Sequence, residues 1–414
     1  MATKSLSNLS LTSYSLYNAA SDSIANWSRG FILTALKRIT IGEIGIKDIT
    51  ANETLQFGKP GKLSTTLTVN SSAMWWRVLS RGSLGFSEAY MLGEVDCDDM
   101  TSFLEIMVYN RNDTADMKTP LSYLTSSMAH YDLSNDMFAA FLSPDMTYSC
   151  PKWLPADNAE SKTDNLEKAQ IRKLQEIIQQ ARIKKEDHVL EIGTGWGSFA
   201  IEAKQEAETR IAAAGFEKNI TVLLKDYREL PKQGLLFDKV VSIEMLEHVG
   251  KAHLPGYFGT VNELLKKEGG IAVFQSSTMP ETFHSTISDM QLQFYHLQIF
   301  PGAHLPTATQ MVEAANQGSG GSLIPDRLIN LGGHYSRCLR GWRENFADNF
   351  ESRIMPALME RNGGVTKSDI EIFRKKWMFY FYFCEAGFKT KTLGVTMITF
   401  VREGSVDTLE GLVQ

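Results

Sequence analysis

The segment from Val189 to Gly197 constrains the fold of this chain more than any other. Its sequence, VLEIGTGWG, begins as an apolar run typical of a buried strand and continues into a turn with three glycines. Glycine has no side chain, so it permits tight turns and lets the backbone approach a ligand closely. We therefore expect a strand that ends in a glycine-rich turn, with a helix opening at Ser198.

Glu191 indicates which cofactor such a turn would bind. It lies at the predicted end of the strand, beside the glycines. A carboxylate there would repel a pyrophosphate, but it suits the cationic amino-acid end of S-adenosylmethionine. An ordinary strand-to-helix turn is the alternative interpretation of the glycines alone, so the surrounding sequence must decide.

The composition indicates a globular protein that is long enough for two or three domains. The chain has 414 residues, of which 43% are hydrophobic. Its net charge of −6 gives no overall basic field that would attract nucleic acid. The four cysteines have no CxxC spacing, which favours a reducing, cytoplasmic location without a disulfide framework or a metal site. No apolar run approaches the length of a membrane span.

Three parts of the chain are predicted from these patterns. Residues 1–30 are rich in Ser, Asn and Ala and suit a flexible leader. Residues 31–118 form a small α+β domain, and residues 119–414 form a larger α/β domain. In the small domain, Ile41 to Ile49 and Leu63 to Val69 alternate apolar and polar residues as half-buried strands do.

Other elements of the small domain follow from turn and helix signals. Asn52 to Lys62 is predicted as the turn between the two strands. A helix begins near Trp75, and the glycine-containing segment Gly82 to Phe86 breaks it.

The larger domain alternates strands with helices. Leu166 to Ala181 has the apolar spacing of an amphipathic helix. After the strand at Val189, further strands are predicted at Ile220 to Leu224, Lys239 to Ile243, Gly270 to Phe274, Arg327 to Leu331 and Leu393 to Val401. This alternation predicts a mainly parallel, doubly wound sheet with ligands at the carboxyl ends of its strands.

Polar residues follow several of these strands. Gln275 ends one strand and Tyr335 follows another, while Glu247 and His248 lie shortly after a third. On a helix, adjacent residues point about 100° apart, so only one of Glu247 and His248 would face a site. Glu247 is the better candidate, because a lone histidine is more often capped or solvated.

Two further patterns leave alternatives open. Cys150 and Cys384 are candidate nucleophiles, but free cysteines are also common as small buried hydrophobic residues. The run from Trp377 to Phe383 is aromatic on every helical face, which favours core packing. Its functional interpretation is an apolar pocket for a carbocation, because a desolvated cation over an aromatic ring gains about 2 kcal/mol.

Taken together, these segments resemble the cyclopropane-fatty-acyl-phospholipid synthase family, which includes the mycolic acid cyclopropane synthases. The resemblance covers most of the chain in order. The matching segments are Gly82 to Gly93, His130 to Phe138, Met146 to Cys150, Leu166 to Leu174, Val189 to Gly197, Asp226 to Arg228, Met245 to Gly250, Phe300 to Pro306, His334 with Tyr335, and Cys384 to Phe388.

This resemblance implies an enzyme with the Rossmann-like sheet of class I methyltransferases. Its activity would be the transfer of a methylene group from S-adenosylmethionine. The acceptor would be the cis double bond of an unsaturated phospholipid acyl chain, and the product a cyclopropane fatty acid. A lipid C-methyltransferase that makes a methyl branch is an alternative, as is a catalytically impaired lipid-binding relative. The small domain would help to dock lipid and form a homodimer. Peripheral membrane contact would use residues such as Trp75, Trp76, Arg77 and Arg81, and a packed helix is the alternative interpretation of these residues.

The resemblance also implies roles for individual residues. A bicarbonate ion would be the general base, held by Cys150, Glu247 and Tyr335, with Gln275 where bacterial relatives have a histidine. Cys384 would lie near the acyl pocket. The residues implied for cofactor binding are Tyr148, Ser149, Val189, Glu191, Ile192, Gly193, Thr194, Gly195, Trp196, Gly197, Tyr227 and Arg228.

One interval departs from the family pattern. Between Gly197 and Thr221 there is room for one helix and a turn, whereas the family places a helix, a second strand and another helix there. We therefore expect a sheet that lacks its second strand and a cofactor site without its usual ribose contacts, which puts activity in doubt.

Overall fold

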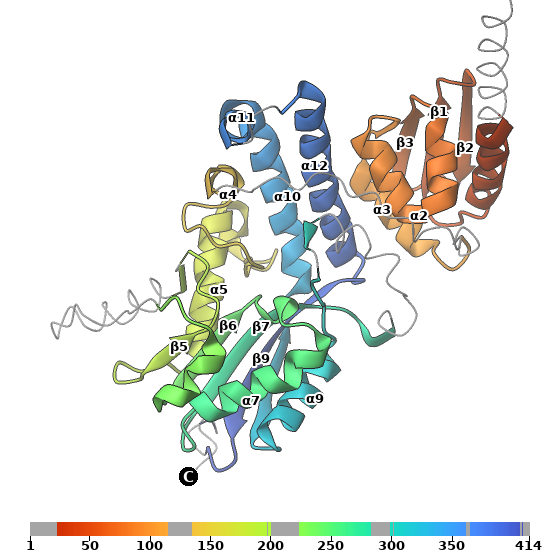
Figure 1. Ribbon diagram of the computed structural model, residues 1–414. Helices are drawn as coiled ribbons and strands as arrows, with labels where there is room; N and C mark the ends of the chain where they lie inside the picture. The colour runs from red at the N-terminus through yellow and green to blue at the C-terminus, as the bar shows by residue number, and fades with distance from the viewer. Residues whose placement is uncertain are drawn as a thin grey trace, which may run out of the picture. The chain divides into compact units, whose positions relative to one another are not determined.

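The computed structural model describes residues 23–114, 135–196, 198–199, 223–282, 299–300, 302–361, 365–405 and 408. They form two compact units (Figure 1). The first comprises the described residues within 1–132, 288–299 and 359–386, and the second those within 133–287, 300–358 and 387–414. The predicted boundary at residues 118 and 119 and residues 1–22 of the predicted leader lie outside the described residues.

The first unit contains a mixed four-stranded sheet in the order β2-β1-β3-β4. Strands β1 and β3 are parallel, whereas β2 and β4 pair antiparallel with them at either edge. The strands are β1 (Glu43–Asp48), β2 (Glu53–Gly58), β3 (Ser64–Val69) and β4 (Val95–Cys97). The helices are residues 23–36, α2 (Ala73–Met91), α3 (Met100–Tyr109) and α12 (Lys367–Lys389) as far as residue 386. The small α+β architecture is therefore confirmed.

Three local predictions in this unit need correction. The segment expected to be a turn, Asn52 to Lys62, contains the edge strand β2, in which only Phe57 is buried, so it lacks an alternating apolar pattern. Residues 23–30, assigned to a flexible leader, are helical. The expected helix break is a kink within α2 at Gly82, where the φ of 58° is a conformation that glycine adopts easily.

The predicted membrane patch on α2 is wrong for Trp75 and stays a prediction for its other residues, of which Trp76 is 43% exposed. Trp75 is only 1% exposed and belongs to the core. Arg77 forms an ion pair with Glu94 at 2.7 Å, and Arg81 forms one with Glu88 at 2.6 Å. These neighbours neutralise the charges that the sequence appeared to offer to a membrane surface.

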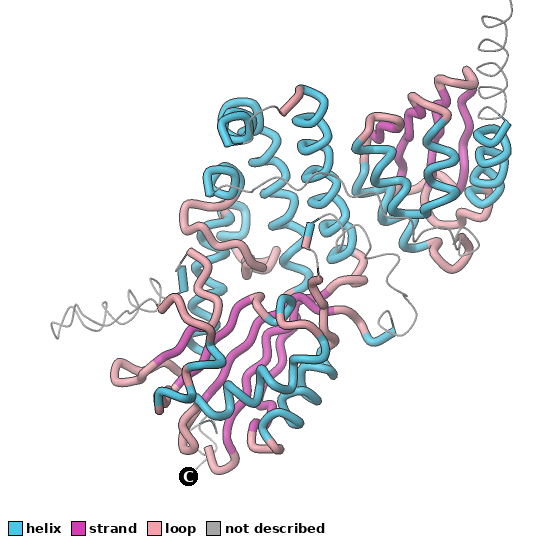
Figure 2. The backbone as a smooth tube through the Cα atoms, in the orientation of Figure 1, coloured by secondary structure: helices cyan, strands magenta, loops and turns pink. Residues whose placement is uncertain are grey.

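The second unit contains a five-stranded sheet in the order β5-β6-β7-β9-β8 (Figure 2). The parallel strands are β5 (Val189–Glu191), β6 (Lys239–Ile243) and β7 (Ile271–Thr278). Strand β9 (Gly394–Arg402) runs antiparallel to both β7 and β8 (Leu323–Asn330). A single reversed strand leaves the sheet mainly parallel, as predicted.

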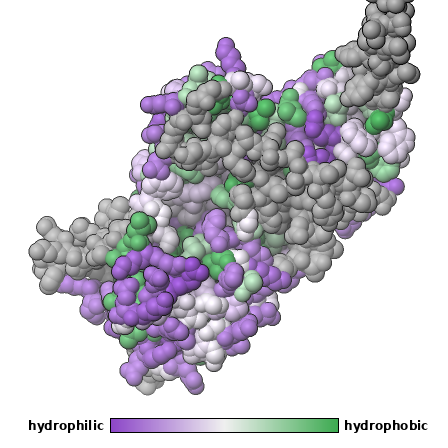
Figure 3. Space-filling view, in the orientation of Figure 1, coloured by the Kyte–Doolittle hydropathy of each residue, from purple (hydrophilic) through white to green (hydrophobic). Residues whose placement is uncertain are grey.

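Helices pack against this sheet and define its core. Phe258 of α7 (Leu254–Leu264) and Met311 of α9 (Ala308–Ser319) join Phe274 and Phe400 in one buried apolar cluster. Figure 3 shows mainly hydrophilic and intermediate residues on the outer surface of this region. The remaining helical elements are α4 (Asn135–Phe141), η3 (Ala159–Thr163), α5 (Leu166–Ala181), η4 (Tyr227–Glu229), η5 (Pro231–Gln233), η6 (Leu246–His248), η7 (Lys251–His253), α10 (Gly332–Asn349), η9 (Phe350–Ile354) and α11 (Met355–Arg361).

The predicted strand at Ile220 to Leu224 has a mixed outcome. Its first three residues lie outside the described residues, and Leu223 and Leu224 are exposed and not in a strand. The expected loss of the second strand concerns the interval after Gly197, of which only Ser198 and Phe199 are described before residue 223. No helix among the described residues is both long and apolar enough to span a membrane.

Candidate active site

The glycine-rich turn has the predicted conformation. Strand β5 ends at Glu191, and Gly193 and Gly195 follow with φ angles of 86° and 52°. A Cβ atom at Gly193 would lie 3.0 Å from the side chain of Met245, whereas one at Gly195 would meet nothing within 4 Å. The positive φ angles therefore favour glycine at both positions, and the space next to Gly195 is free of other described atoms, so a ligand could approach its backbone. Gly197 lies outside the described residues.

Glu191 presents an acceptor beside this turn. Its Oε2 atom is buried and has no hydrogen-bond partner among the described residues. Burial raises the pKa of Glu191 to about 7, although the positive charge of Lys173 acts in the opposite direction. A cationic ligand beside this enclosed carboxylate would stabilise its charged form more than a neutral ligand would. These residues therefore fit the amino-acid end of S-adenosylmethionine.

Three predicted site residues converge on Glu244, the residue that follows β6. The Cys150 amide and the Gln275 side chain each donate to Glu244 Oε1 at 2.8 Å. The Tyr335 hydroxyl, from the first turn of α10, donates to Glu244 Oε2 at 3.0 Å. The backbone amide of Glu244 also donates to the carbonyl of Gln275 at 2.7 Å. Loop, strand and helix thus hold one carboxylate through both of its oxygens.

Glu247 lies close by in η6 but has a different environment. Its side chain is buried, with Oε1 accepting from the Ser277 amide at 2.5 Å and Oε2 lacking a partner among the described residues. Burial, reinforced by the negative charge of Glu244, raises the pKa of Glu247 to about 8. Burial also raises the pKa of Glu244, but its three donors favour its charged form. Each carboxyl therefore disfavours ionisation of the other, and more hydrogen-bond donors reach Glu244 than reach the Glu247 side chain among the described residues.

Lys173 brings a buried amine to the same region. Its side chain on α5 is fully buried, and its Nζ donates to the Ser149 hydroxyl at 2.7 Å. Burial lowers the pKa of Lys173, while the carboxylates of Glu244 and Glu191 act to raise it. The neighbouring Gln170 side chain donates to the carbonyl of Ser149 at 2.8 Å. Helix α5 thereby fixes the segment that leads into Cys150.

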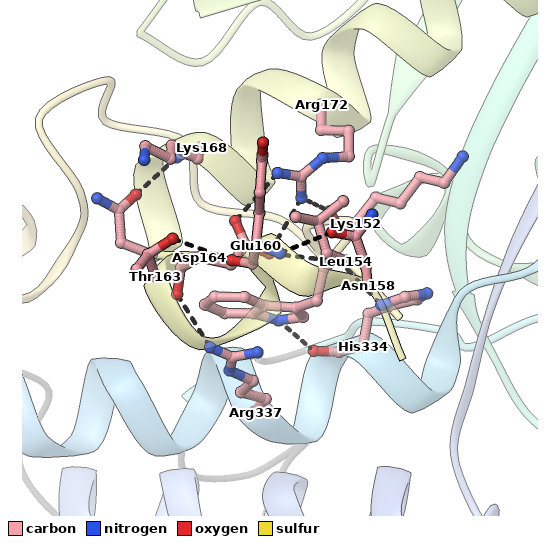
Figure 4. Close-up of polar contacts among 12 residues, drawn as sticks. Lys152, Leu154, Asn158, Glu160, Thr163, Asp164, Lys168, Arg172, His334 and Arg337 are labelled. Carbon is pink, nitrogen blue, oxygen red and sulfur yellow. Dashed lines mark hydrogen bonds and ion pairs between the residues drawn. The ribbon is translucent and has the colours of Figure 1, made fainter. Parts of the chain in front are cut away.

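A polar network fixes the chain on the other side of Cys150 (Figure 4). Asp164 accepts two hydrogen bonds from Arg172, at 3.0 and 3.2 Å, and one from the amide of Leu154 at 2.9 Å. Arg172 also donates to the carbonyl of Lys152 at 2.7 Å, and Arg337 of α10 donates to the carbonyl of Asp164 at 3.0 Å.

Trp153 completes this attachment to α10. Its amide donates to His334 Nδ1 at 3.1 Å, and its indole donates to the His334 carbonyl at 3.0 Å. The Arg337 guanidinium lies 3.8 Å from the centre of its ring. The segment from Cys150 to Leu154 is consequently held by both α5 and α10, which orients the Cys150 amide toward Glu244.

Aromatic rings connect the glycine-rich turn with Tyr335. Trp196 lies 5.3 Å from Phe138, which lies 5.3 Å from Tyr148. Tyr148 stacks on Trp342 at 5.0 Å, and Trp342 contacts Tyr335 edge to face at 5.7 Å. These π faces provide an apolar environment that could stabilise a developing cation.

The other predicted residues lie elsewhere or contribute differently. Tyr227 packs on Tyr257 at 5.1 Å, while the exposed Arg228 pairs with Asp226. The Cys150 thiol is fully buried, and burial raises its pKa well above the ordinary value, so it is no thiolate nucleophile at neutral pH. Cys384 is buried on α12 in the first unit, where burial also raises its pKa.

The structure corrects the expected bicarbonate site. Bicarbonate was expected to be held by Cys150, Glu247 and Tyr335, with help from Gln275, but three of these four residues donate to Glu244 instead. A bound anion would lack those donors and would place a second negative charge beside the carboxylate. The residues present therefore do not fit bicarbonate. Glu244 was not predicted as a site residue. The one sequence signal for it is its position directly after a predicted strand.

The strand order and the carboxyl-end site define the second unit as a class I methyltransferase fold. It is similar to the cyclopropane synthase MmaA2 of Mycobacterium tuberculosis, with a TM-score of 0.53 and 23% identity over 66% of this chain and 95% of that one. Residues 120–398 match the family model described as mycolic acid cyclopropane synthetase. The chain belongs to this family of S-adenosylmethionine-dependent methyltransferases.

Two relatives extend the similarity over most of the chain. The tuberculostearic acid methyltransferase UfaA1 of Mycobacterium tuberculosis is 32% identical over 366 residues, which cover 79% of this chain and 81% of that protein. The cyclopropane-fatty-acyl-phospholipid synthase of Escherichia coli is 28% identical over 382 residues, covering 83% of this chain and 89% of that protein.

Proposed function

We propose that this chain adds a methylene group from S-adenosylmethionine to the cis double bond of an unsaturated phospholipid acyl chain, forming a cyclopropane ring. The observation that carries this proposal is a pair of carboxyl groups, the half-buried Glu244 and the buried Glu247, beside the glycine-rich turn and a series of aromatic rings. An alkene is a weak nucleophile, and the cation formed from it would react with water. A site for this reaction must therefore align the double bond and exclude water.

The proposed cofactor contacts follow from the same edge of the sheet. When bound, S-adenosylmethionine supplies an electrophilic methyl group. Glu191 and the backbone from Ile192 to Trp196 would hold its amino-acid end, with Tyr148 and Ser149 alongside. We assign Tyr227 and Arg228 to the adenine end.

A methyl-branching reaction on a lipid is the second candidate. It is favoured by the 32% identity to a protein named for tuberculostearic acid methylation. Both reactions begin with methyl transfer to an alkene and loss of a proton. They diverge in whether the electrons of the broken C–H bond close a ring or form a new double bond.

Membrane contact is proposed through the helix at residues 23–36 rather than through α2. Ile24, Trp27 and Phe31 are 46%, 64% and 40% exposed and recur at helical spacing. Trp27→Ser should reduce cosedimentation with anionic phospholipid vesicles severalfold, and unchanged cosedimentation would remove this helix from the proposal. The homodimer implied by the family resemblance can be measured by sedimentation velocity.

Calorimetric titration with S-adenosylmethionine is the first test of the proposed function. Binding by the folded chain is expected, and absence of binding would favour a lipid-binding relative without catalysis. Incubation with unsaturated phospholipid and methyl-labelled cofactor should then yield labelled lipid. Because a ring and an exomethylene group add the same mass, proton NMR must identify the product. Cyclopropane signals are expected, whereas new alkene signals would favour the methyl-branching route.

A further inference from the structure

We propose that the Glu244 carboxylate is the general base of this reaction, in the position where the family resemblance places a bicarbonate ion. This inference rests on the proposed function. Its structural part, a built-in anion in the bicarbonate position, can be tested without turnover.

The hydrogen bonds around Glu244 are those expected of an anion site. Its two oxygens accept from a backbone amide, a side-chain amide and a phenol, contributed by Cys150, Gln275 and Tyr335. Gln275 is 1% exposed and also donates to the carbonyl of Cys150 at 3.3 Å, so its amide is held in this orientation. The donors come from three different elements, yet they converge on one carboxylate.

The electrostatic surroundings keep this carboxylate available to accept a proton. Lys173 is fully buried nearby, and its positive charge favours the ionised form of Glu244. Glu247 has an unpartnered Oε2 among the described residues, and burial raises its pKa to about 8. Three hydrogen bonds to its oxygens favour the charged form of Glu244, whereas the Glu247 side chain accepts from the Ser277 amide, so we place the negative charge of the pair on Glu244. Glu244 is also only partly buried, whereas Glu247 is 4% exposed. A base needs access to its substrate, and of the two residues Glu244 has more.

Glu244 also lies at the reacting edge of the sheet. Its neighbour Met245 packs against Gly193 of the cofactor turn, and the Ser242 hydroxyl donates to the carbonyl of Ile192 at 3.2 Å. Tyr335 joins Glu244 to the aromatic series that ends at Trp196. The base, the turn and the aromatic rings therefore surround the same region.

The proton transfer balances without another reactant. Once a methyl group has been added to one alkene carbon, the other carbon is a cation. Glu244 takes a proton from the added methyl group, forming an O–H bond. The electrons of the broken C–H bond form the C–C bond that closes the ring. The protonated carboxyl then returns its proton to solvent.

The backbone of Glu244 provides a favourable test variant. Its φ of 49° is uncommon for a residue with a side chain, so glycine at this position is conformationally tolerated. Glu244→Gly would remove the carboxylate and leave the donors of Cys150, Gln275 and Tyr335 for an added anion. Glu244→Gln keeps the size of the side chain but cannot act as this base.

The binding arm of the experiment uses calorimetry with sodium bicarbonate and, separately, sodium formate. We expect Glu244→Gly to bind these anions at least tenfold more tightly than the wild type, and Glu244→Gln to bind them no better than the wild type. Equal binding by wild type and Glu244→Gly would overturn the inference. Circular dichroism and S-adenosylmethionine titration identify which variants are folded.

The turnover arm compares the same proteins in carbonate-free buffer with and without added bicarbonate. The wild type should be indifferent to bicarbonate, and Glu244→Gln should lose about 10²- to 10⁴-fold in kcat with little change in cofactor affinity. Bicarbonate or formate should restore part of the activity of Glu244→Gly. A wild type that requires bicarbonate, or a fully active Glu244→Gln, would refute Glu244 as the base. If no unsaturated lipid is modified by the wild type, the proposed function fails, while the binding arm still decides whether Glu244 fills the anion position.

Discussion

Replacing Glu247 with glutamine should stabilise the protein at alkaline pH while having little effect near pH 5. In the unfolded chain this carboxyl loses its proton near its ordinary pKa of 4.5, whereas in the folded protein it keeps the proton up to a pKa of about 8. Between these values, the unfolded state is charged and the folded state is neutral. The contribution of Glu247 to stability is therefore fully present below pH 4.5, is lost as the pH rises to about 8, and stays lost above it.

The magnitude follows from the two pKa values. Each pKa unit corresponds to about 1.4 kcal/mol, so the shift from 4.5 to about 8 costs the wild type on the order of 5 kcal/mol at high pH. Glutamine cannot ionise, and its carbonyl can still accept from the Ser277 amide that now donates to Glu247 Oε1. This energetic cost already includes the repulsion from Glu244, which the variant removes. We expect it to be more stable than the wild type by about 3–5 kcal/mol near pH 8.5, and by about 1 kcal/mol or less near pH 5.

Urea unfolding followed by tryptophan fluorescence at the two pH values measures this difference. Glu263→Gln is the matched control, because it removes the same charge from an exposed position on α7 of the same unit. The control should change stability by less than about 0.5 kcal/mol at either pH. An advantage of Glu247→Gln that is absent at pH 8.5, or equal at both pH values, would refute a buried neutral acid at this position.

Two further predictions concern the supports of the site. Asp164→Ala should lower the free energy of unfolding by about 2–3 kcal/mol. This loss is smaller than for a fully buried ion pair, because the side chain of its partner Arg172 is 26% exposed. As a control, Lys266→Ala breaks the more exposed ion pair with Asp238 and should cost less than about 1 kcal/mol. Thermal melts of both variants test this, and equal losses would contradict the anchoring role of Asp164. Gly193→Ala would put a side chain on a residue with a φ of 86° and place its methyl group 3.0 Å from the Met245 side chain. Its affinity for S-adenosylmethionine, measured by calorimetry, should therefore fall at least tenfold. A variant with wild-type affinity would show that the turn tolerates a side chain.

The sequence predicts best those elements whose periodicity reflects one buried face or a fully buried run. Helix α5 and strand β6 have the predicted bounds, because the first has a continuous apolar stripe and the second is apolar throughout most of its length. Strand β2 was missed because it is an edge strand with one buried residue. Its conformation depends on pairing with β1, which a local pattern does not reveal.

The site shows the same division between local and long-range information. Each of Cys150, Gln275 and Tyr335 could be selected from its place near a strand end or in a motif. Their common partner could not, since the three hydrogen bonds join residues 94, 31 and 91 positions apart. The positive φ of Glu244 is also set by the structure that follows β6 rather than by its own preference. Long-range convergence, and not residue type, distinguishes Glu244 from Glu247.

A base that belongs to the chain changes the energetic requirements of the site. Bicarbonate must be captured from solution for each active complex, whereas a side-chain carboxylate is always present at its position. The cost is that a second carboxyl group must be held close to Glu247, and two adjacent negative charges would be strongly unfavourable. Lys173, three convergent donors and the retained proton on Glu247 together offset that cost. A negative charge on Glu244 raises the pKa of Glu247, and a proton retained on Glu247 in turn lowers the cost of that charge.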